Sequence, residues 1–340
     1  MATYSPTGSG GIHYDQILTN ISLGYEQVGE FIAEQLVKVV PVKKQTDKYY
    51  VFGRESWIPS GTDYRAPGTV ANEIGGIQVS TDTYYAQEHA LQIVVTDEER
   101  ENADSAFSPD RDATELVTAK ILLNRELAVR NFVTDTSRYA PSLVKTLTAT
   151  TQWDVYATSD PVQDIRLAKF AVHNTSFVDP NVAVIPYQVM FFLLDHPKII
   201  DRIKYTDRAI LTEELVASVL NLTNVVVPGM PVGTSAGTSN NFNMTATYLW
   251  GDDVLLAYVP KKAGLKTPAF AYEFAWTYGG KVMLTDRWRE EVRKSDLIRV
   301  SRRYDHKMIG VGTNPADAAT YNKSIVAFLL KDVLSPAAGV

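Results

Sequence analysis

The stretch GGIQVSTDTYYAQEHALQIVV, from Gly75 to Val95, restricts the fold more than any other part of the sequence. Polar and apolar side chains alternate along it, and this period of two predicts a β-strand. One continuous strand would be about 60 Å long, whereas ordinary strands have about five or six residues. The expected apolar face carries Ile77, Val79, Tyr85, Leu91, Ile93 and Val95, and the polar face carries Gln78, Ser80, Asp82, Glu88 and Gln92.

Gly75 and Gly76 form a hairpin-turn pair, and the preceding TVANEI can supply the returning arm. A two-stranded ribbon is marginally stable in water unless something covers its apolar face. A neighbouring copy of the chain could provide a surface of the required length. The alternative, which typical strand lengths favour, is two shorter strands broken near Thr81–Thr83.

Composition excludes several classes of protein. The chain has 340 residues, 45% of them hydrophobic, which suffices for a core and for two or three packed subregions. Its formal net charge of −6 gives no basic excess of the kind that marks a dedicated nucleic-acid-binding protein. It has no cysteine, so disulfides, thiolate chemistry and cysteine-based zinc sites are excluded. The start lacks a signal-peptide pattern, and no run of about 18 apolar residues predicts a membrane span.

Two helices are expected in the first 140 residues. YEQVGEFIAEQLVKVV, residues 25–40, has apolar side chains at helical spacing and is followed by Pro41, which should end the helix. The second helix should begin at Pro109 and run to about Thr134, roughly 37 Å. Arg125 and Glu126 are expected outside its apolar stripe. That stripe is predicted at Leu116, Ala119, Leu123 and Leu127, widened by Val117, Ile121 and Ala128.

From about Thr146 onward, short strands should alternate with helices. Thr212 should cap one helix, and Pro197 should kink or restart another. The predicted helices cover residues 160–174, 186–205 and 211–222. The predicted strands lie at 181–185, at 224–229, in two segments joined at Gly251–Asp252, within 281–312 and at 323–334.

No pattern of catalytic or metal-binding residues stands out. The five histidines lack the spacing of a metal site, and the motifs GxSxG, GxGxxG and DFG do not occur. His196 follows Asp195, and such a neighbour can orient a catalytic histidine, although most such pairs are polar residues at helix ends. Asp252 and Asp253 could hold Mg²⁺, but paired acids also suit a tight turn, which is the favoured interpretation.

Basic residues cluster between residues 287 and 307. Acidic residues are interleaved with them, which favours ion pairs over phosphate contacts, because a phosphate track requires a single sign of charge. In the strand LIRVSRRYDHK, one face should be packed and the face with Arg299, Ser301 and Arg303 charged. The basic residues are Arg287, Arg289, Arg293, Lys294, Arg299, Arg302, Arg303 and Lys307.

The order of these segments resembles the major capsid protein of tailed bacteriophages, with the coat fold first described for phage Hong Kong 97. The resemblance covers roughly residues 25–334 and depends on order and spacing, not on any single motif. The stretches that carry it are GEFIAEQLVKVVPVKKQTDKYYVFGRE, YRAPGTVANEIGG, DTYYAQEHALQIVVTDEERENAD, ATELVTAKILLNRELAVRNF, HPKIIDRIKYTDRAILTEELVASVLNLTNVVV and YLWGDDVLLAYVP.

The resemblance implies an α+β coat fold and a structural function. Many copies would form hexamers and pentamers of an icosahedral head around double-stranded DNA, with no enzymatic activity, cofactor or metal. Two alternatives remain: an encapsulin-like nanocompartment shell and, more remotely, a hydrolase using Asp195 and His196. The implied regions are an amino-terminal arm (1–45), an extended β-hairpin loop (46–96), a peripheral domain with a spine helix (97–155), an axial domain (156–270), peripheral return strands (271–316) and a carboxy-terminal strand and tail (317–340).

The resemblance also implies partners and interface residues. A separate scaffolding protein is expected, because the first helix begins near Tyr25 and the chain still begins at Met1. Portal and cement proteins are expected as further partners, and DNA should be packaged without sequence specificity. No membrane is expected to take part, and virions should assemble in the host cytoplasm. An isopeptide cross-link from the loop is not expected, since no lysine lies between Lys48 and Lys120. The candidate interface residues are Arg54, Arg65, Tyr84, Tyr85, Glu88, Arg287, Arg289, Arg293 and Arg303.

Overall fold

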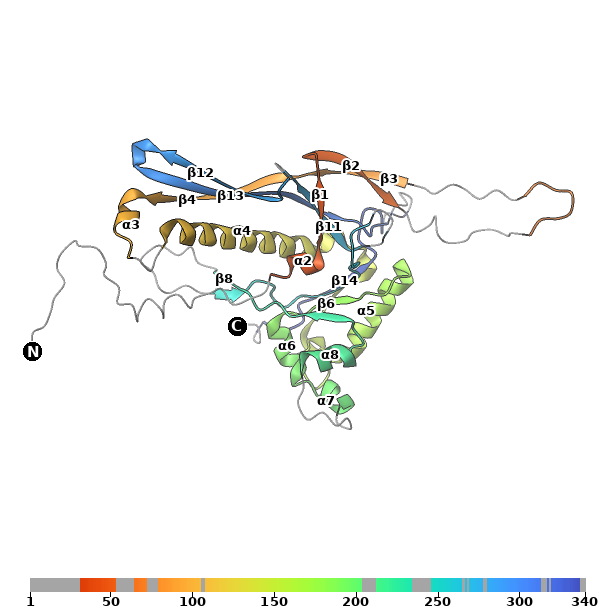
Figure 1. Ribbon diagram of the computed structural model, residues 1–340. Coiled ribbons are helices and arrows are strands. Elements are labelled where there is room, and N and C mark those ends of the chain that lie inside the picture. The colour runs from red at the N-terminus through yellow and green to blue at the C-terminus, as the bar shows by residue number, and fades with distance from the viewer. Residues whose placement is uncertain are drawn as a thin grey trace, which may run out of the picture. The chain divides into compact units, whose positions relative to one another are not determined.

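The computed structural model shows a mixed α+β protein with several sheets (Figure 1). It describes residues 31–52, 64–71, 79–104, 108–203, 212–233, 246–264, 267, 269–277, 280–312, 317 and 319–336. The chain divides into two compact units. The first unit comprises Met1–Val28, Glu88–Leu123 and Met283–Arg302, and the second comprises Gly29–Gln87, Asn124–Val282 and Arg303–Val340. No helix in the described ranges is both long and apolar enough to cross a membrane.

The first unit packs one face of a helix against strands. β12 (Met283–Glu290) and β13 (Ser295–Met308) are antiparallel, and β4 (Gln87–Thr96) also pairs with β13. The short helix α3 (Asp97–Glu101) follows β4, and the long helix α4 (Pro109–Thr134) begins in this unit. The core places Val95 and Ala113 against Ile298, and Val117 and Ile121 against Val300.

The ends of α4 confirm the prediction, but its buried face agrees with the prediction at Val117 and Ile121 and not at Leu116. Leu116 is 49% exposed, whereas Arg125 and Glu126 are only 2% and 1% exposed. The buried positions continue from Val117 and Ile121 to this charged pair, so the stripe is displaced by about one residue, or roughly 100° around the helix. The displacement follows from β13, whose side chains select the opposing helix face.

The predicted packed face of β13 is confirmed, because Ile298, Val300 and Tyr304 are buried. The residues of the predicted charged face are half-buried at Arg299, Arg303, Asp305 and Lys307, and Ser301 is the exception, being fully buried. Arg302 alternates with Ser301 along the strand, so it shares the packed face and is buried with it.

A five-stranded sheet forms the centre of the second unit. Its order is β5 (Val144–Thr146), β14 (Ala327–Lys331), β10 (Val254–Ala257), β6 (Val182–Val184) and β7 (Asn224–Val226). The helices of this part are α5 (Pro161–Ser176), α6 (Tyr187–Leu194), α7 (Pro197–Ile203) and α8 (Glu213–Val219). Short 3₁₀ helices lie at Thr136–Arg138, Pro141–Leu143, Ala149–Thr151 and, in the first unit, Glu291–Arg293.

Several local predictions for this region are confirmed. α7 restarts at Pro197, and the Thr212 hydroxyl accepts a hydrogen bond from the Leu215 N–H at the start of α8. The predicted strands at 181–185 and 323–334 correspond to β6 and β14. The two strands joined at Gly251–Asp252 have different partners, because β9 (Ala246–Tyr248) pairs with β8 (Pro231–Gly233), whereas β10 pairs with β14 and β6.

Two further strand pairs of the second unit include the segment from Lys38 to Phe52. β1 (Lys38–Val42) is parallel to β11 (Ala271–Trp276), and β2 (Thr46–Phe52) is antiparallel to β3 (Val79–Tyr85). The predicted helix over 25–40 is wrong beyond Leu36, because the described helix α2 covers only Ala33–Leu36. Pro41 does not end a helix but lies inside β1, at an edge position where a strand tolerates a missing N–H.

The long strand of Gly75–Val95 is two strands in the described residues, but they separate at Ala86 and not near Thr81–Thr83. Ala86 is buried, and its N–H donates to the Gln45 carbonyl, 2.9 Å away, which ends the β3 ladder. The buried face changes there, because Tyr84 in β3 and Val95 in β4 would lie on opposite faces of one uninterrupted strand. The partner of β3 is β2 and not the TVANEI segment, whose residues 72–74, like the turn Gly75–Gly76, lie outside the described residues.

Candidate functional site

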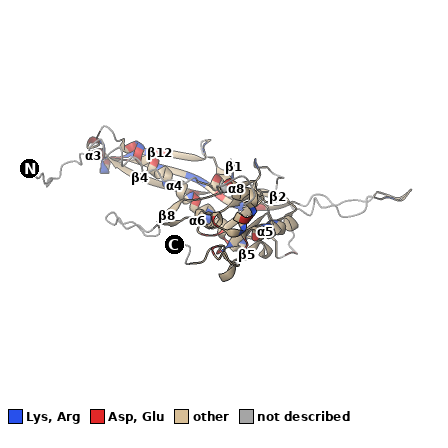
Figure 2. Cartoon of the chain, turned by 90° about the horizontal axis from the view of Figure 1, so that it is seen from below, with Lys and Arg blue, Asp and Glu red and all other residues tan. Residues whose placement is uncertain are grey.

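An acid–arginine cluster forms the most highly charged part of the first unit, and Figure 2 shows acidic and basic residues close together where α3 and β12 lie. Arg100 Nη2 lies 2.7 Å from Asp110 and 2.9 Å from Asp296. Arg289 binds both oxygens of Asp97 at 2.6 Å, a bidentate geometry that fixes orientation as well as charge. The members of the cluster are Asp97, Arg100, Asp110, Arg287, Arg289 and Asp296.

The arginines of this cluster favour the ionised forms of Asp97 and Asp296. The hydrogen bond from Arg287 lowers the pKa of Asp296, and the hydrogen bond from Arg289 lowers the pKa of Asp97. The interpretation of the basic stretch as an ion-pair network is therefore confirmed for Arg287 and Arg289. A phosphate would have to displace carboxylates that already face these guanidinium groups.

The other predicted interface residues are dispersed. Arg293 lies 3.6 Å from Glu290 in the first unit, and Arg303 lies over the Trp276 ring in the second. Tyr84 is buried and stacks on Phe274 with ring centroids 4.8 Å apart, so its ring belongs to the core. Arg65, Tyr85 and Glu88 are exposed, and Arg54 lies outside the described residues.

A buried charged group in the second unit was missed by sequence reasoning. Arg125 Nε donates to Glu273 Oε2 at 2.7 Å, and Nη1 donates to Glu34 at 3.1 Å. Glu273 is fully buried, and its Oε2 also lies 3.2 Å from His306 Nε2. The signal that could have revealed this group is a pair of adjacent opposite charges, Arg125 and Glu126, within the mostly apolar segment ILLNRELAV of the helix.

Glu126 holds the start of α2. Its carboxylate accepts hydrogen bonds from the N–H groups of Ala33 at 2.9 Å and Ile32 at 3.4 Å, and from Trp250 Nε1 at 3.0 Å. Burial raises the pKa of Glu126, and these N–H donors act in the opposite direction. The neighbouring charges of α4 therefore serve two purposes: Arg125 balances Glu273, and Glu126 anchors the amino-terminal segment.

His196 has a structural environment. It is fully buried, its Nε2 lies 3.0 Å from the Ser159 hydroxyl, and its Nδ1 accepts the Lys198 N–H at the start of α7. Ser159 donates its own proton to the Val155 carbonyl, so it is not poised as a nucleophile. Burial lowers the pKa of His196, which favours the neutral ring that these hydrogen bonds require.

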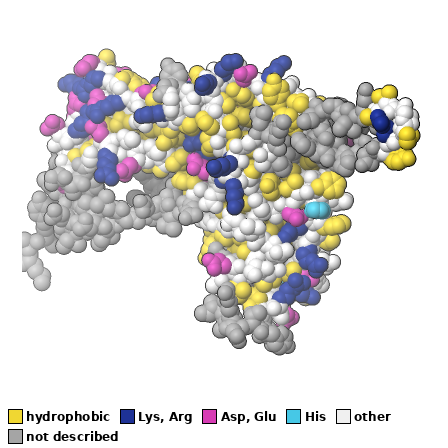
Figure 3. All heavy atoms as spheres, turned by 45° about the vertical axis from the view of Figure 1, so that its right-hand side comes forward, with side chains coloured by type: hydrophobic (Ala, Val, Ile, Leu, Met, Phe, Trp, Pro, Cys, Tyr) yellow, Lys and Arg dark blue, Asp and Glu magenta, His cyan; other side chains and the backbone are white. Residues whose placement is uncertain are grey.

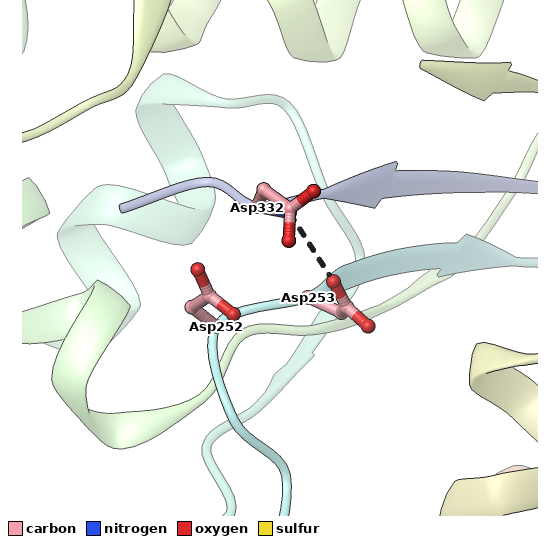
Figure 4. Close-up of side chains that lie close together, drawn as sticks. All are labelled: Asp252, Asp253 and Asp332. Carbon is pink, nitrogen blue, oxygen red and sulfur yellow. Dashed lines mark hydrogen bonds between the residues drawn. The ribbon is translucent and has the colours of Figure 1, made fainter. Parts of the chain in front are cut away.

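Asp252 and Asp253 come together with Asp332, and one oxygen of each carboxylate lies within 4.8 Å of the others (Figure 4). Asp332 follows β14, and nothing in the sequence indicated that it would meet the other two. The Asp332 N–H donates to Asp253 at 3.3 Å, and the Leu334 N–H donates to Asp252 at 3.4 Å. These hydrogen bonds fasten the segment before β10 to the segment after β14. The predicted turn is present as well, because the Gly251 N–H donates to the Tyr248 carbonyl at 3.2 Å.

Asp332→Asn is expected to stabilise the subunit at pH 7 by about 0.2–1 kcal/mol, since it removes one of three neighbouring negative charges. Asn also tolerates the left-handed backbone of Asp332, where φ is 52°. Burial raises the pKa of both Asp252 and Asp253, so the folded state binds protons more tightly than the unfolded state. Ionisation of Asp252 and Asp253 therefore lowers the free energy of unfolding, and this loss develops as the pH rises from their unfolded-state pKa values to the raised pKa values of the folded state.

Thermal unfolding at pH 7 and pH 4 measures this effect. The advantage of Asp332→Asn should shrink at pH 4, where Asp252 and Asp253 take up protons. Asp201→Asn, on the exposed side of α7, is the matched control and should show no such change. A loss of stability from Asp332→Asn at pH 7 would contradict this account and would indicate that the three charges are needed together.

Comparison with known proteins supplies the family. No family model matches the chain. The major capsid protein of Burkholderia phage BcepMu is 32% identical over 295 residues, which are 84% of this chain and 91% of that protein. The chain belongs to the family of phage major capsid proteins. The major capsid protein of Pseudomonas phage JBD67 is 30% identical over 186 residues, covering 55% of this capsid protein and 58% of the relative.

Solved structures agree on the fold of this capsid protein. A phage-related protein from Bordetella bronchiseptica matches with a TM-score of 0.68 at 22% identity, covering 95% of this chain and 98% of that chain. A chain from Mycobacterium phage Adephagia matches with a TM-score of 0.57 at 12% identity, covering 96% of each chain. The coat fold of phage Hong Kong 97 is thus confirmed, and the capsid protein is a structural component of a shell and not an enzyme.

Proposed function

We propose that copies of this capsid protein form hexameric and pentameric capsomers that close an icosahedral head around double-stranded DNA. The observation that carries the proposal is the similarity to a phage major capsid protein over 91% of the relative's length. A role in a homo-oligomeric shell of the virion follows from the family. This proposal covers the icosahedral geometry of the shell, the double-stranded DNA inside it and the six regions delineated from the sequence.

Electron microscopy of the expressed chain tests the proposal. Capsomer rings or closed shells are the expected particles, with fivefold and sixfold classes after image averaging. A monomer at all protein concentrations, or assemblies that are neither rings nor shells, would contradict it. Mass spectrometry of intact particles purified from phage-producing cells would identify the packaged nucleic acid.

We further propose that a separate scaffolding protein guides assembly in the host cytoplasm and that portal and cement proteins bind the shell. The chain expressed alone should then give aberrant or incomplete shells, and co-expression with the scaffolding protein should give uniform ones. Efficient, uniform assembly by the chain alone would count against a scaffold. The exposed residues Arg65, Tyr85 and Glu88, together with Arg54, are the proposed points of contact between subunits.

DNA should be retained without sequence-specific contacts. The net charge of −6 and the pairing of Arg287 and Arg289 with carboxylates leave little local excess of positive charge there. Counterions would balance the phosphates, so DNA release from opened particles should depend only weakly on salt, unlike binding through many lysine and arginine contacts.

Mature particles should not be covalently cross-linked through the extended loop. An isopeptide bond requires a deprotonated lysine amine, and between Lys48 and Lys120 the sequence has no lysine. Within residues 54–96, Arg54 and Arg65 are the basic residues, and a guanidinium group stays protonated at any working pH. Denaturing electrophoresis of mature particles should show a single band near 37.7 kDa. A ladder of oligomers that resists denaturant and reductant would contradict this prediction.

A further inference from the structure

The outer face of α5 carries large apolar side chains that nothing in the described part of the chain covers. Phe170 is 67% exposed and Phe177, directly after the helix, is 60% exposed. Leu167 continues the same line one turn earlier. The opposite face of α5 is already packed through Ile165 and Val172. Figure 3, which turns the side of α5 forward, shows hydrophobic side chains at the surface there. We call Leu167, Phe170 and Phe177 the α5 stripe.

The backbone at Phe177 indicates that this exposure has a use. Phe177 is the C-cap of α5 with φ of 57° and ψ of 23°, a left-handed conformation that glycine or asparagine adopts at lower cost. His173 holds the ring in an edge contact, with centroids 6.4 Å apart, and His173 Nδ1 lies 2.9 Å from Asp179. A strained aromatic residue directed into solvent destabilises the free subunit, so its benefit must come from a contact made elsewhere.

A second apolar stripe lies on α6. Tyr187 is 48% exposed and Phe191, one turn later, is 58% exposed. Ile200 on α7 is also exposed. Tyr187 packs beside Tyr248 with ring centroids 5.8 Å apart, so its ring has a fixed position. We call Tyr187 and Phe191 the α6 stripe.

The two stripes end in opposite charges. Arg166 is exposed four residues before Phe170, on the line of the α5 stripe, and Asp195 is exposed four residues after Phe191, on the line of the α6 stripe. Among the described residues, neither Arg166 nor Asp195 has an ion-pair partner. The basic residues of α7 do not disturb this pattern, because Lys198 and Arg202 lie about 160° from Ile200 around that helix.

We propose that the α5 stripe of one copy packs against the α6 stripe of the next copy, with Arg166 facing Asp195. This inference depends on the proposed function, in which copies of the chain associate. Pairing of unlike stripes is a head-to-tail contact, which closes into rings when the rotation between copies allows it. A twofold dimer that pairs a stripe with its own copy would leave the other stripe in water, whereas a ring of unlike pairs covers both on every copy.

The size of the stripes suits reversible ring formation. Each aromatic side chain can bury about 150–250 Å², so one contact alone is modest. Closure of the ring makes its last contact intramolecular, which raises the overall stability of the ring without new residues. The charged ends set the direction of pairing, because they favour α5 against α6 over either stripe against itself.

Charge reversal tests the proposal on full-length protein. Arg166→Glu and Asp195→Arg should each reduce the yield of rings and shells at least tenfold by electron microscopy and light scattering. The double variant should restore most of the yield, because it restores the opposite signs. Lys262→Glu, an equal charge change at an exposed turn of the second unit, is the control and should assemble normally.

The outcomes separate this inference from the proposed function. If the unchanged protein forms no assemblies, the proposed function fails before any variant is considered. If it assembles and both single reversals also assemble, or if both fail and the double variant fails equally, the pairing is wrong. Unfolding temperatures of the free variants show that each still folds, since all the changed side chains are exposed.

Phe177→Asn gives a second, independent readout. The free subunit should unfold at the same or a higher temperature, because asparagine adopts the left-handed conformation more easily. Assembly should nevertheless weaken at least threefold, because one ring of the α5 stripe is lost. Unimpaired assembly would overturn the role of Phe177, and a lower unfolding temperature would mean that its ring supports the subunit itself.

Discussion

Replacing Arg125 by methionine is expected to lower the free energy of unfolding of the free subunit by about 3–5 kcal/mol. The guanidinium group is only 2% exposed and donates to Glu273, which is fully buried. Methionine retains much of the apolar stem but leaves Glu273 without its cationic partner. A buried charge whose partner is removed costs more than the pair itself contributed. Chemical denaturation of the free subunit, followed by tryptophan fluorescence, measures the loss.

Two further variants identify the cause. Glu34→Gln removes the exposed partner of the same guanidinium and should cost less than about 1 kcal/mol, because that carboxylate is well solvated. The double variant Arg125→Met with Glu273→Met should recover more than half of the loss, since it removes the uncompensated charge. A loss of less than about 1 kcal/mol from Arg125→Met alone would refute the importance of the buried pair.

Ile121→Ala is expected to destabilise the free subunit by about 2–5 kcal/mol, as large-to-small changes in a packed core do. Ile121 is 3% exposed and belongs to the cluster with Val117 and Val300. Leu116→Ala removes a comparable side chain from the same helix, but Leu116 lies half in solvent, so its cost should stay below about 1 kcal/mol.

The comparison between these two variants is more informative than either value. Equal costs at Leu116 and Ile121 would contradict the orientation of α4 in the first unit. Shells provide a further measurement: if Leu116 is covered by a neighbouring copy, Leu116→Ala should weaken assembly without changing the unfolding of the free subunit.

The limits of α4 could be predicted because they depend on local signals. Pro109 and the acidic residues of the first turn favour a helix start, and the sequence up to Thr134 contains no helix breaker. The buried face depends on which side chains of β13 oppose the helix, at a distance of about 180 residues in sequence, for example Val117 against Val300. Apolar residues such as Leu116 and Leu123 surround much of the helix, so periodicity alone could not decide between neighbouring faces.

The long strand illustrates the same division between local and distant causes. Alternation correctly predicted extended backbone over Val79–Tyr85 and Gln87–Thr96. The break at Ala86 arises because the Ala86 N–H bonds to Gln45 and the two strands have different partners. No local residue signals that change, and Ala86 is neither a glycine nor a proline.

Charge patterns were predictable where opposite signs alternate along one segment, as for Arg287 and Asp296. They were not predictable where partners come from distant segments. Asp332 meets Asp252 and Asp253 only because β14 and β10 are neighbours in the sheet. Tyr84 was a candidate for contact with other subunits because it lies in the stretch that resembles the extended loop, yet it is buried against Phe274.

The ion pair between Arg289 and Asp97 has a consequence for a chain without cysteine. It joins positions 192 residues apart, a separation over which many proteins would use a disulfide. A disulfide opens only by redox chemistry, whereas an ion pair opens and closes with thermal motion and with ionic strength. The ion pair therefore holds this end of the first unit reversibly. Each capsid subunit can open and re-form the contact while it adjusts to neighbouring subunits, in oxidising and reducing surroundings alike.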